Sequence, residues 1–188
     1  MIVELETAPA SEPLEINQVK NHLGIDENNT FYDERLNRLI TGARKTLEEQ
    51  TAQRFITQVV NFHFDDLNRV IKIPVLPVQS IDSFTYYDEN GAQQSMNSVL
   101  YFSDIVSKPP KIVLKSDQFW PSLEKDRPNR CTIQMTVGYG AAIAVPEEIT
   151  IALFMMIEIL FDRPDVSYQD ALTSCKNSVL GQHYFNWF

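Results

Sequence analysis

The residues that could carry out chemistry are few and lie far apart in the sequence. The two cysteines, Cys131 and Cys175, and the three histidines follow no metal-ligand spacing and form no disulfide framework. Cys131 opens a predicted strand, so we expect a small packed side chain there. Cys175 lacks the cationic neighbours that would activate a thiol. His63 lies within a strand pattern, where we expect a half-buried or surface histidine.

Pairs of acidic residues occur at 48–49, 65–66 and 147–148, and paired carboxylates can serve as a general acid and base. Adjacent residues do not face each other on a helix, so we interpret these pairs as solvated faces and a helix start. Nucleophile-elbow, zinc-helix and glycine-rich phosphate motifs are missing, and Gly138 and Gly140 only mark a strand exit. No signal of an enzyme and no metal-site pattern remains among these residues.

The charge balance argues against two classes of partner. The 188 residues carry 25 acids against 16 bases, a net charge of −9, which disfavours dedicated nucleic-acid binders and anionic membranes. Lys108, Lys111 and Lys115 lie near Phe119 and Trp120, but nearby acids dilute this cluster, so we expect a strand with solvated lysines.

The chain shows no segment that predicts secretion or a membrane span. The N-terminus has neither the basic region nor the apolar run of a signal peptide. The most apolar stretch, residues 149–161, is shorter than the roughly 20 residues that cross a bilayer. We therefore expect a soluble intracellular protein, or part of an assembly built inside a cell.

The periodicity of the chain predicts an α+β fold. Residues 1–55 and 141–188 read as helical and form a helical core. Residues 56–140 read as a β-rich insertion, which forms an antiparallel sheet or a small barrel.

The N-terminal zone predicts two helices. The first covers residues 16–23 and ends at Gly24. The second runs to about residue 51, with capping-box-like spacing between Thr30 and Asp33. Its apolar residues form one stripe, and its charged residues, which include Arg44 and Glu48, lie mostly outside that stripe. The stripe consists of Leu36, Leu39, Ile40, Ala43 and Leu47.

The middle zone predicts short strands separated by turns. Asn90-Gly91 is a strong hairpin signal, because both residues readily take positive φ angles. The expected strands are residues 55–64, 70–73, 81–87, 93–96, 100–102, 111–115 and 131–137.

The C-terminal zone predicts a core helix that starts at Pro146 and ends near residue 161. It is apolar on nearly every face, so we expect it to pack against the stripe of the second helix. The expected contacts from this helix are Ile149, Leu153, Met156, Ile157 and Leu160. Residues 167–180 form a weaker predicted helix.

The end of the chain is rich in aromatic residues that are costly to leave in water. We expect them to dock either on their own domain or on another subunit, and both remain open. Together with Trp120 they are the candidate subunit or partner contacts: Tyr184, Phe185, Trp187 and Phe188.

An ordered series of phrases resembles a known family. The phrases cover residues 13–25, 33–55, 76–81, 85–91, 119–121, 136–140 and 145–149, and the most specific is Leu76-Pro-Val-Gln-Ser-Ile81 followed by Thr85-Tyr-Tyr-Asp-Glu-Asn-Gly91. Over about residues 13–166 the chain resembles the head–tail connector, or head-completion adaptor, proteins of tailed phages and prophages, in the form with a β-rich insertion. The tail after Ser167 does not clearly match.

The resemblance implies a structural virion protein that is not an enzyme and carries no cofactor. Such proteins assemble in the host cytoplasm as a ring, with twelvefold symmetry, on the portal at the head–tail junction. They extend the DNA channel, which DNA passes without sequence-specific binding, and they receive the next connector or tail protein. No membrane partner is implied.

A second interpretation treats the β-rich insertion as the working part. It would then be a ligand- or surface-binding module of a phage tail or adhesin, supported by the helices. Its contacts would be Tyr86, Tyr87, Tyr101 and Trp120.

Overall fold

The computed structural model describes residues 1–163 and 165–176, with side chains to residue 173. Among these residues the α-helices are α1 (Ile16–His22), α2 (Asp33–Thr51), α3 (Glu147–Asp162) and α4 (Tyr168–Lys176). The strands are β1 (Ile2–Thr7), β2 (Gln58–Phe64), β3 (Val70–Lys72), β4 (Val78–Tyr87), β5 (Gln93–Ser95), β6 (Tyr101–Asp104), β7 (Lys111–Leu114) and β8 (Cys131–Val137). Short 3₁₀ turns lie at Ser98–Leu100 and Ala142–Ala144. The predicted α+β class is confirmed.

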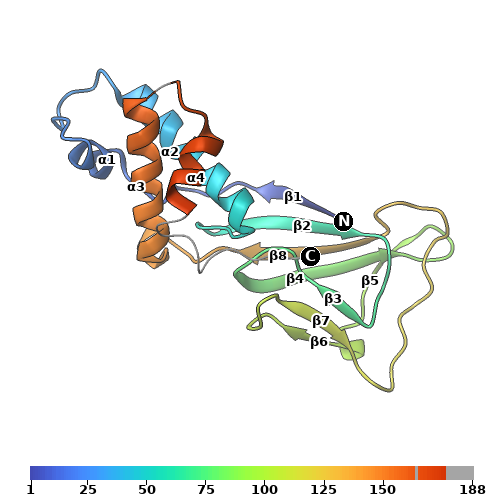
Figure 1. The fold of residues 1–188 in the computed structure, drawn as a ribbon. Helices are drawn as coiled ribbons and strands as arrows, with labels where there is room; N and C mark the ends of the chain where they lie inside the picture. Colours follow the sequence, from blue (N-terminus) through green and yellow to red (C-terminus); the bar gives the residue numbers. More distant parts are fainter. Residues whose placement is uncertain (164, 177–188) are drawn as a thin grey trace. The chain divides into compact units, whose positions relative to one another are not determined.

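The strands form two open antiparallel sheets, so the small-barrel alternative is wrong. The larger sheet has the order β1-β2-β8-β4-β5, and the smaller has the order β3-β7-β6. Figure 1 shows β1, β2, β8 and β4 running side by side. Both ends of each sheet remain edges, because β1 does not pair with β5 and β3 does not pair with β6.

The chain divides into two compact units. The β unit comprises residues 1–9 and 57–138, and the helical unit comprises residues 10–56 and 139–188. The expectation that the N-terminal zone is wholly helical is wrong at its start, because Ile2–Thr7 pairs with β2 as a strand. Its residues alternate between apolar and acidic side chains, which suits an exposed edge strand.

The core of the β unit lies on one face of the larger sheet. Burial alternates strictly along β2 and β8. Phe62 of β2 is opposite Ile133 of β8, which is also opposite Phe84 of β4. This three-strand row is almost fully buried, and the Phe62 ring stacks on Phe64 with centroids 5.0 Å apart. Apolar side chains in cross-strand register therefore hold the sheet to its core.

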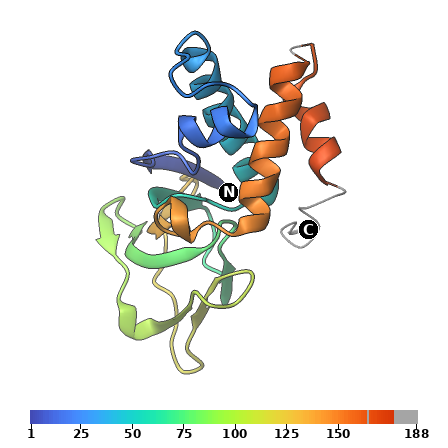
Figure 2. The ribbon, with the colours of Figure 1, turned by 90° about the vertical axis from the view of Figure 1, so that its left-hand side faces the viewer.

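The core of the helical unit is built by α2 and α3. The predicted contact set is confirmed, since Leu36, Ile40 and Leu47 are buried in one cluster with the inward residues of α3. The inward set of α3 is Ile149, Leu153, Met156, Ile157 and Leu160. Leu39 is partly buried beside the cluster. Figure 2 shows α3 beside α4, which adds Ala171 and Leu172 to the same core.

The ends of the helices follow the sequence signals with one exception. Gly24 has φ +68°, as expected for a left-handed stop after α1. Pro146 is the N-cap of α3, and two glutamates follow it in the first turn. The Thr30–Asp33 capping box is wrong, because Tyr32 is the N-cap of α2 and no side chain caps that end. Instead, the Asp33 carboxylate forms an ion pair with the buried Lys20 amine, 2.6 Å away, which fixes its orientation.

We expect Leu153→Ala to destabilise the helical unit by about 2–5 kcal/mol, because the side chain is fully buried in the core and its loss leaves a cavity. Urea denaturation followed by far-ultraviolet circular dichroism measures the change. Ile151→Ala on the same helix is the matched control. Since Ile151 is 42% exposed, its loss costs less than about 1 kcal/mol. Equal midpoints for the two variants would contradict the core assignment.

Candidate interaction surfaces

The titratable residues do not converge on a reactive centre in the described part of the chain. No group of three or more histidine, cysteine, aspartate or glutamate residues there could hold a metal ion. His63 lies 2.9 Å from the Thr132 hydroxyl and 3.2 Å from Glu4, and His22 lies 3.1 Å from Glu158. Among the described residues, no helix is long and apolar enough to cross a bilayer.

Cys131 is a packed core residue, as predicted. Its side chain is fully buried at the start of β8. Burial raises the pKa of the Cys131 thiol to about 12, although the nearby Arg130 acts in the opposite direction. The side chain of Cys175 lies outside the described residues.

We expect native Cys131 to resist alkylation at about pH 8, because the thiol is both protonated and inaccessible. A Cys175→Ser background isolates this thiol, and mass spectrometry counts the iodoacetamide adducts. The same chain in denaturant is the control and should react fully. Rapid labelling of the native chain would contradict the packed role.

Of the predicted contact residues, only Trp120 lies in the described part of the chain. Tyr184, Phe185, Trp187 and Phe188 lie outside it. The Trp120 indole N–H donates to the backbone oxygen of Asn68 at 3.0 Å. Its ring is half-buried and lies 6.1 Å from those of Phe84 and Tyr101. Trp120 therefore serves partly as an anchor within the β unit.

The aromatic residues of the second interpretation also have internal partners. The Tyr101 ring lies 5.7 Å from Phe84, and Tyr86 packs on the edge of the same core. The guanidinium of Arg127 lies 3.4 Å from the centroid of the Tyr87 ring, a cation–π contact. The structure brings Tyr101 and Trp120 together, but both are directed to the core of the β unit rather than to an open binding face.

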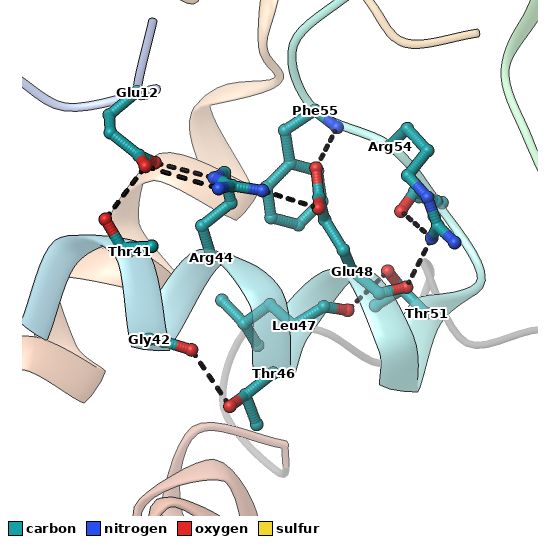
Figure 3. Close-up of polar contacts among 11 residues, drawn as sticks. Glu12, Thr41, Gly42, Arg44, Thr46, Leu47, Glu48, Thr51, Arg54 and Phe55 are labelled. Carbon is teal, nitrogen blue, oxygen red and sulfur yellow. Dashed lines mark hydrogen bonds and ion pairs between the residues drawn. The ribbon is translucent and has the colours of Figure 1, made fainter. Parts of the chain in front are cut away.

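A buried ionic network lies where the sequence predicted solvated side chains. Arg44 and Glu48 of α2 are only 6% and 5% exposed. Arg44 Nε donates to Glu12 at 2.6 Å, and Arg44 Nη1 donates to Glu48 at 2.9 Å. Glu12 also accepts from the Thr41 hydroxyl at 2.9 Å. Figure 3 shows the three side chains in one line, with Arg44 between the two carboxylates.

The network ties two loops to α2. Glu48 accepts the backbone N–H of Phe55 at 2.9 Å, which fixes the chain after the helix. Glu12 lies in the segment before α1 and holds that segment to the helix by accepting from the Arg44 side chain. Burial alone would lower the pKa of Arg44, but the hydrogen bonds and charges of Glu12 and Glu48 outweigh it and raise that pKa. Arg44 thus stays charged, and the network organises the helical unit rather than a reaction.

One open surface is the outer face of the small sheet, formed by Val70, Lys72, Phe102, Lys111 and Val113. Val70, Val113 and Phe102 are paired across the three strands and so point to the same side. The next paired row is Lys72, Lys111 and Asp104. Phe102 is 62% and Val70 44% exposed. On the opposite side of the sheet, Ile71 and Ile112 are buried.

A second open surface is a groove of about 320 Å³ at the start of α3, which we call the α3 groove. Leu14 and Val145 are buried and form its floor, while Ile143 projects from its edge at 97% exposure. Glu15 and Glu147, both exposed, are its charged lining residues within the described chain. The groove is therefore apolar at its base and acidic at its margin.

Three solved structures share the fold of this chain. They are described as the neck of an empty GTA particle computed with C6 symmetry, the virion of a native gene transfer agent particle, and the neck of a native GTA particle computed with C12 symmetry. Their TM-scores are 0.75, 0.73 and 0.71, at 16%, 16% and 17% identity. Each match covers 93% of this chain, and 95%, 94% and 94% of the other chains. At this level of identity the likeness shows a shared fold.

Sequence comparison finds a likeness to a known family over part of the chain. None of the curated proteins matches the chain significantly. The family model described as phage gp6-like head-tail connector protein matches residues 14–104, which run from α1 through β6. This span contains the most specific phrase of the sequence, at residues 76–91. Over these residues, slightly less than half of its length, the chain is similar to the phage gp6-like head–tail connector family.

Proposed function

We propose that this chain is a structural, non-enzymatic connector of a phage or phage-like particle, which assembles as a ring between head and tail. The observation that carries the proposal is the match of residues 14–104 to the head–tail connector family. Its fold likeness to chains from particle necks, solved with sixfold and twelvefold symmetry, supports the same role. In this proposal the ring sits on the portal at the head–tail junction, with twelvefold symmetry, and assembles in the host cytoplasm.

The charge of the chain suits a passage for DNA. With a net charge of −9, a ring of these subunits repels the phosphate backbone instead of holding it. DNA would pass through the channel without sequence-specific contacts. The partners of the ring are the portal on one side and the next connector or tail protein on the other. The aromatic residues 184, 185, 187 and 188 remain proposed contacts to these partners or to neighbouring subunits.

Native mass measured over a range of concentrations, alone and with the portal ring of the same particle, tests the proposal. We expect either a ring of the chain itself or, where the ring forms only on its template, a stable complex with the portal. Serum albumin in place of the portal controls for non-specific association. A chain that stays monomeric and ignores the portal would overturn the proposal.

A further inference from the structure

We propose that the outer face of the small sheet of one copy docks into the α3 groove of the next copy. This inference rests on the proposed ring and names the surfaces that build it. The two surfaces belong to different units of the chain and differ in both shape and charge. A contact between unlike surfaces is heterologous, and when repeated around an axis it closes a ring.

The outer face of the small sheet offers an apolar row bordered by cations. Val70, Val113 and Phe102 lie across three strands, with Phe102 the most exposed of the three. Lys72 and Lys111 occupy the next row, and the Lys115 amine lies 4.7 Å from the centroid of the Phe102 ring. Asp104 neutralises part of this charge through an ion pair with Lys111 at 3.4 Å. The face therefore has cations on both sides of a projecting aromatic ring.

The α3 groove is the complementary surface. Its buried floor, Leu14 and Val145, and its exposed edge, Ile143, can receive an apolar side chain. Glu15 and Glu147 stand at its margin, where they would face the lysines around Phe102. Such an arrangement is typical of specific interfaces, in which an aromatic anchor enters a pocket and paired charges lie at the rim.

Charge favours a second copy over nucleic acid as the occupant of the lysine-rich face. The helical unit holds 14 acids and 8 bases, so its net charge is −6, against −3 for the β unit. Each copy carries both the acidic α3 groove and the lysine-rich face, so the two surfaces are always present at the same concentration. A phosphate backbone would instead meet the strong negative field of the whole chain.

Disulfide trapping between two separate variants tests the contact directly. One variant carries Phe102→Cys and the other Ile143→Cys, both in a Cys175→Ser background with the buried Cys131 retained. Because each chain has only one introduced thiol, a disulfide between these thiols joins two copies. The two variants are mixed, assembled as the ring or as the portal-bound complex, and mildly oxidised. We expect a covalent dimer to form. The matched control replaces Ile143→Cys by Ile151→Cys, which places a partly exposed thiol on α3, at a residue that does not line the groove.

Charge reversal tests the rim independently of any thiol. We expect Lys72→Glu alone and Glu147→Lys alone each to weaken association about tenfold, and the double variant to recover most of that loss. Lys125→Glu and Glu49→Lys are the controls, because they make the same charge changes at exposed sites outside the two surfaces. Sedimentation velocity measures the association, and circular dichroism verifies that every variant is folded.

The outcomes separate this inference from the proposed ring. Rings that form the disulfide and recover in the double variant support both. Rings or portal complexes that form normally, without the disulfide and without a response to charge reversal, overturn the inference and leave the connector role intact. A folded chain that forms no complex in any condition overturns both.

Discussion

Glu48→Ala is expected to destabilise the helical unit by about 3–5 kcal/mol, one of the two largest losses in this chain. The substitution removes a carboxylate that is 5% exposed and leaves Arg44 buried with half of its counter-charge. It also removes the acceptor of the Phe55 N–H, which then has no side-chain partner from α2. Urea denaturation followed by circular dichroism measures the loss, because the slope and midpoint of the transition give the free energy of unfolding.

The neighbouring glutamate provides the control. Glu49 is exposed on the same helix turn, so Glu49→Ala should change stability by no more than about 0.5 kcal/mol. Removing both charges in a double variant, Arg44→Met with Glu48→Met, should cost less than Glu48→Ala alone, because the buried cation is removed together with Glu48. Glu12 then loses Arg44, but its carboxylate is 31% exposed and keeps the Thr41 hydroxyl as a donor. If the double variant were the less stable of the two, the loss would come from packing and not from the stranded charge.

Phe62→Ala is expected to destabilise the β unit by about 3–5 kcal/mol. Phe62 is fully buried, stacks on Phe64 and is the β2 member of the row that continues through Ile133 to Phe84. Its loss opens a cavity between three strands, which cannot close without moving the sheet. In a Trp187→Phe background the fluorescence of Trp120, which packs against Phe84, reports unfolding of this unit.

An exposed phenylalanine in the same unit is the matched control. Phe102 is 62% exposed on the outer face of the small sheet, so Phe102→Ala should shift the unfolding free energy by less than about 1 kcal/mol. A similar loss of unfolding free energy in Phe62→Ala and Phe102→Ala would contradict the assignment of the Phe62–Ile133–Phe84 row to the core of the β unit.

Elements with a strong and regular pattern were predictable from the sequence. The strand at Cys131–Val137 and the ends of α2 and α3 lie at or within a residue or two of the predicted positions. In each of them the apolar period matches one buried face, and turn residues mark the ends. The Asn90-Gly91 turn likewise occurs where predicted, with Gly91 at φ +77°.

The N-terminal strand was not predictable because its partner determines it. The alternation of apolar and acidic residues within Ile2–Thr7 is short, and these residues are largely exposed, so the pattern alone does not predict a strand. They become a strand only by pairing with β2, whose register places Val3 opposite Phe62. β1 and β2 are separated in the sequence by α1 and α2, so no residue close to Ile2–Thr7 in the chain indicates this pairing.

The ionic network was missed for a related reason. Arg44 and Glu48 are one turn apart on α2 beside the apolar stripe, where charged side chains normally meet water. Their burial depends on Glu12, which is 32 residues earlier in the chain than Arg44, and on the backbone of Phe55. Nothing in the spacing along α2 indicates these partners.

The position of β1 at the sheet edge has a consequence for aggregation. β2 is seven residues long with alternate side chains buried, and without β1 its backbone donors and acceptors would face other molecules along its whole length. β1 replaces that edge by a strand that carries Glu4 and Glu6, while the opposite edge, β5, is only three residues long. The first seven residues therefore protect the sheet against pairing with foreign strands, and chains that start after them would lose this protection.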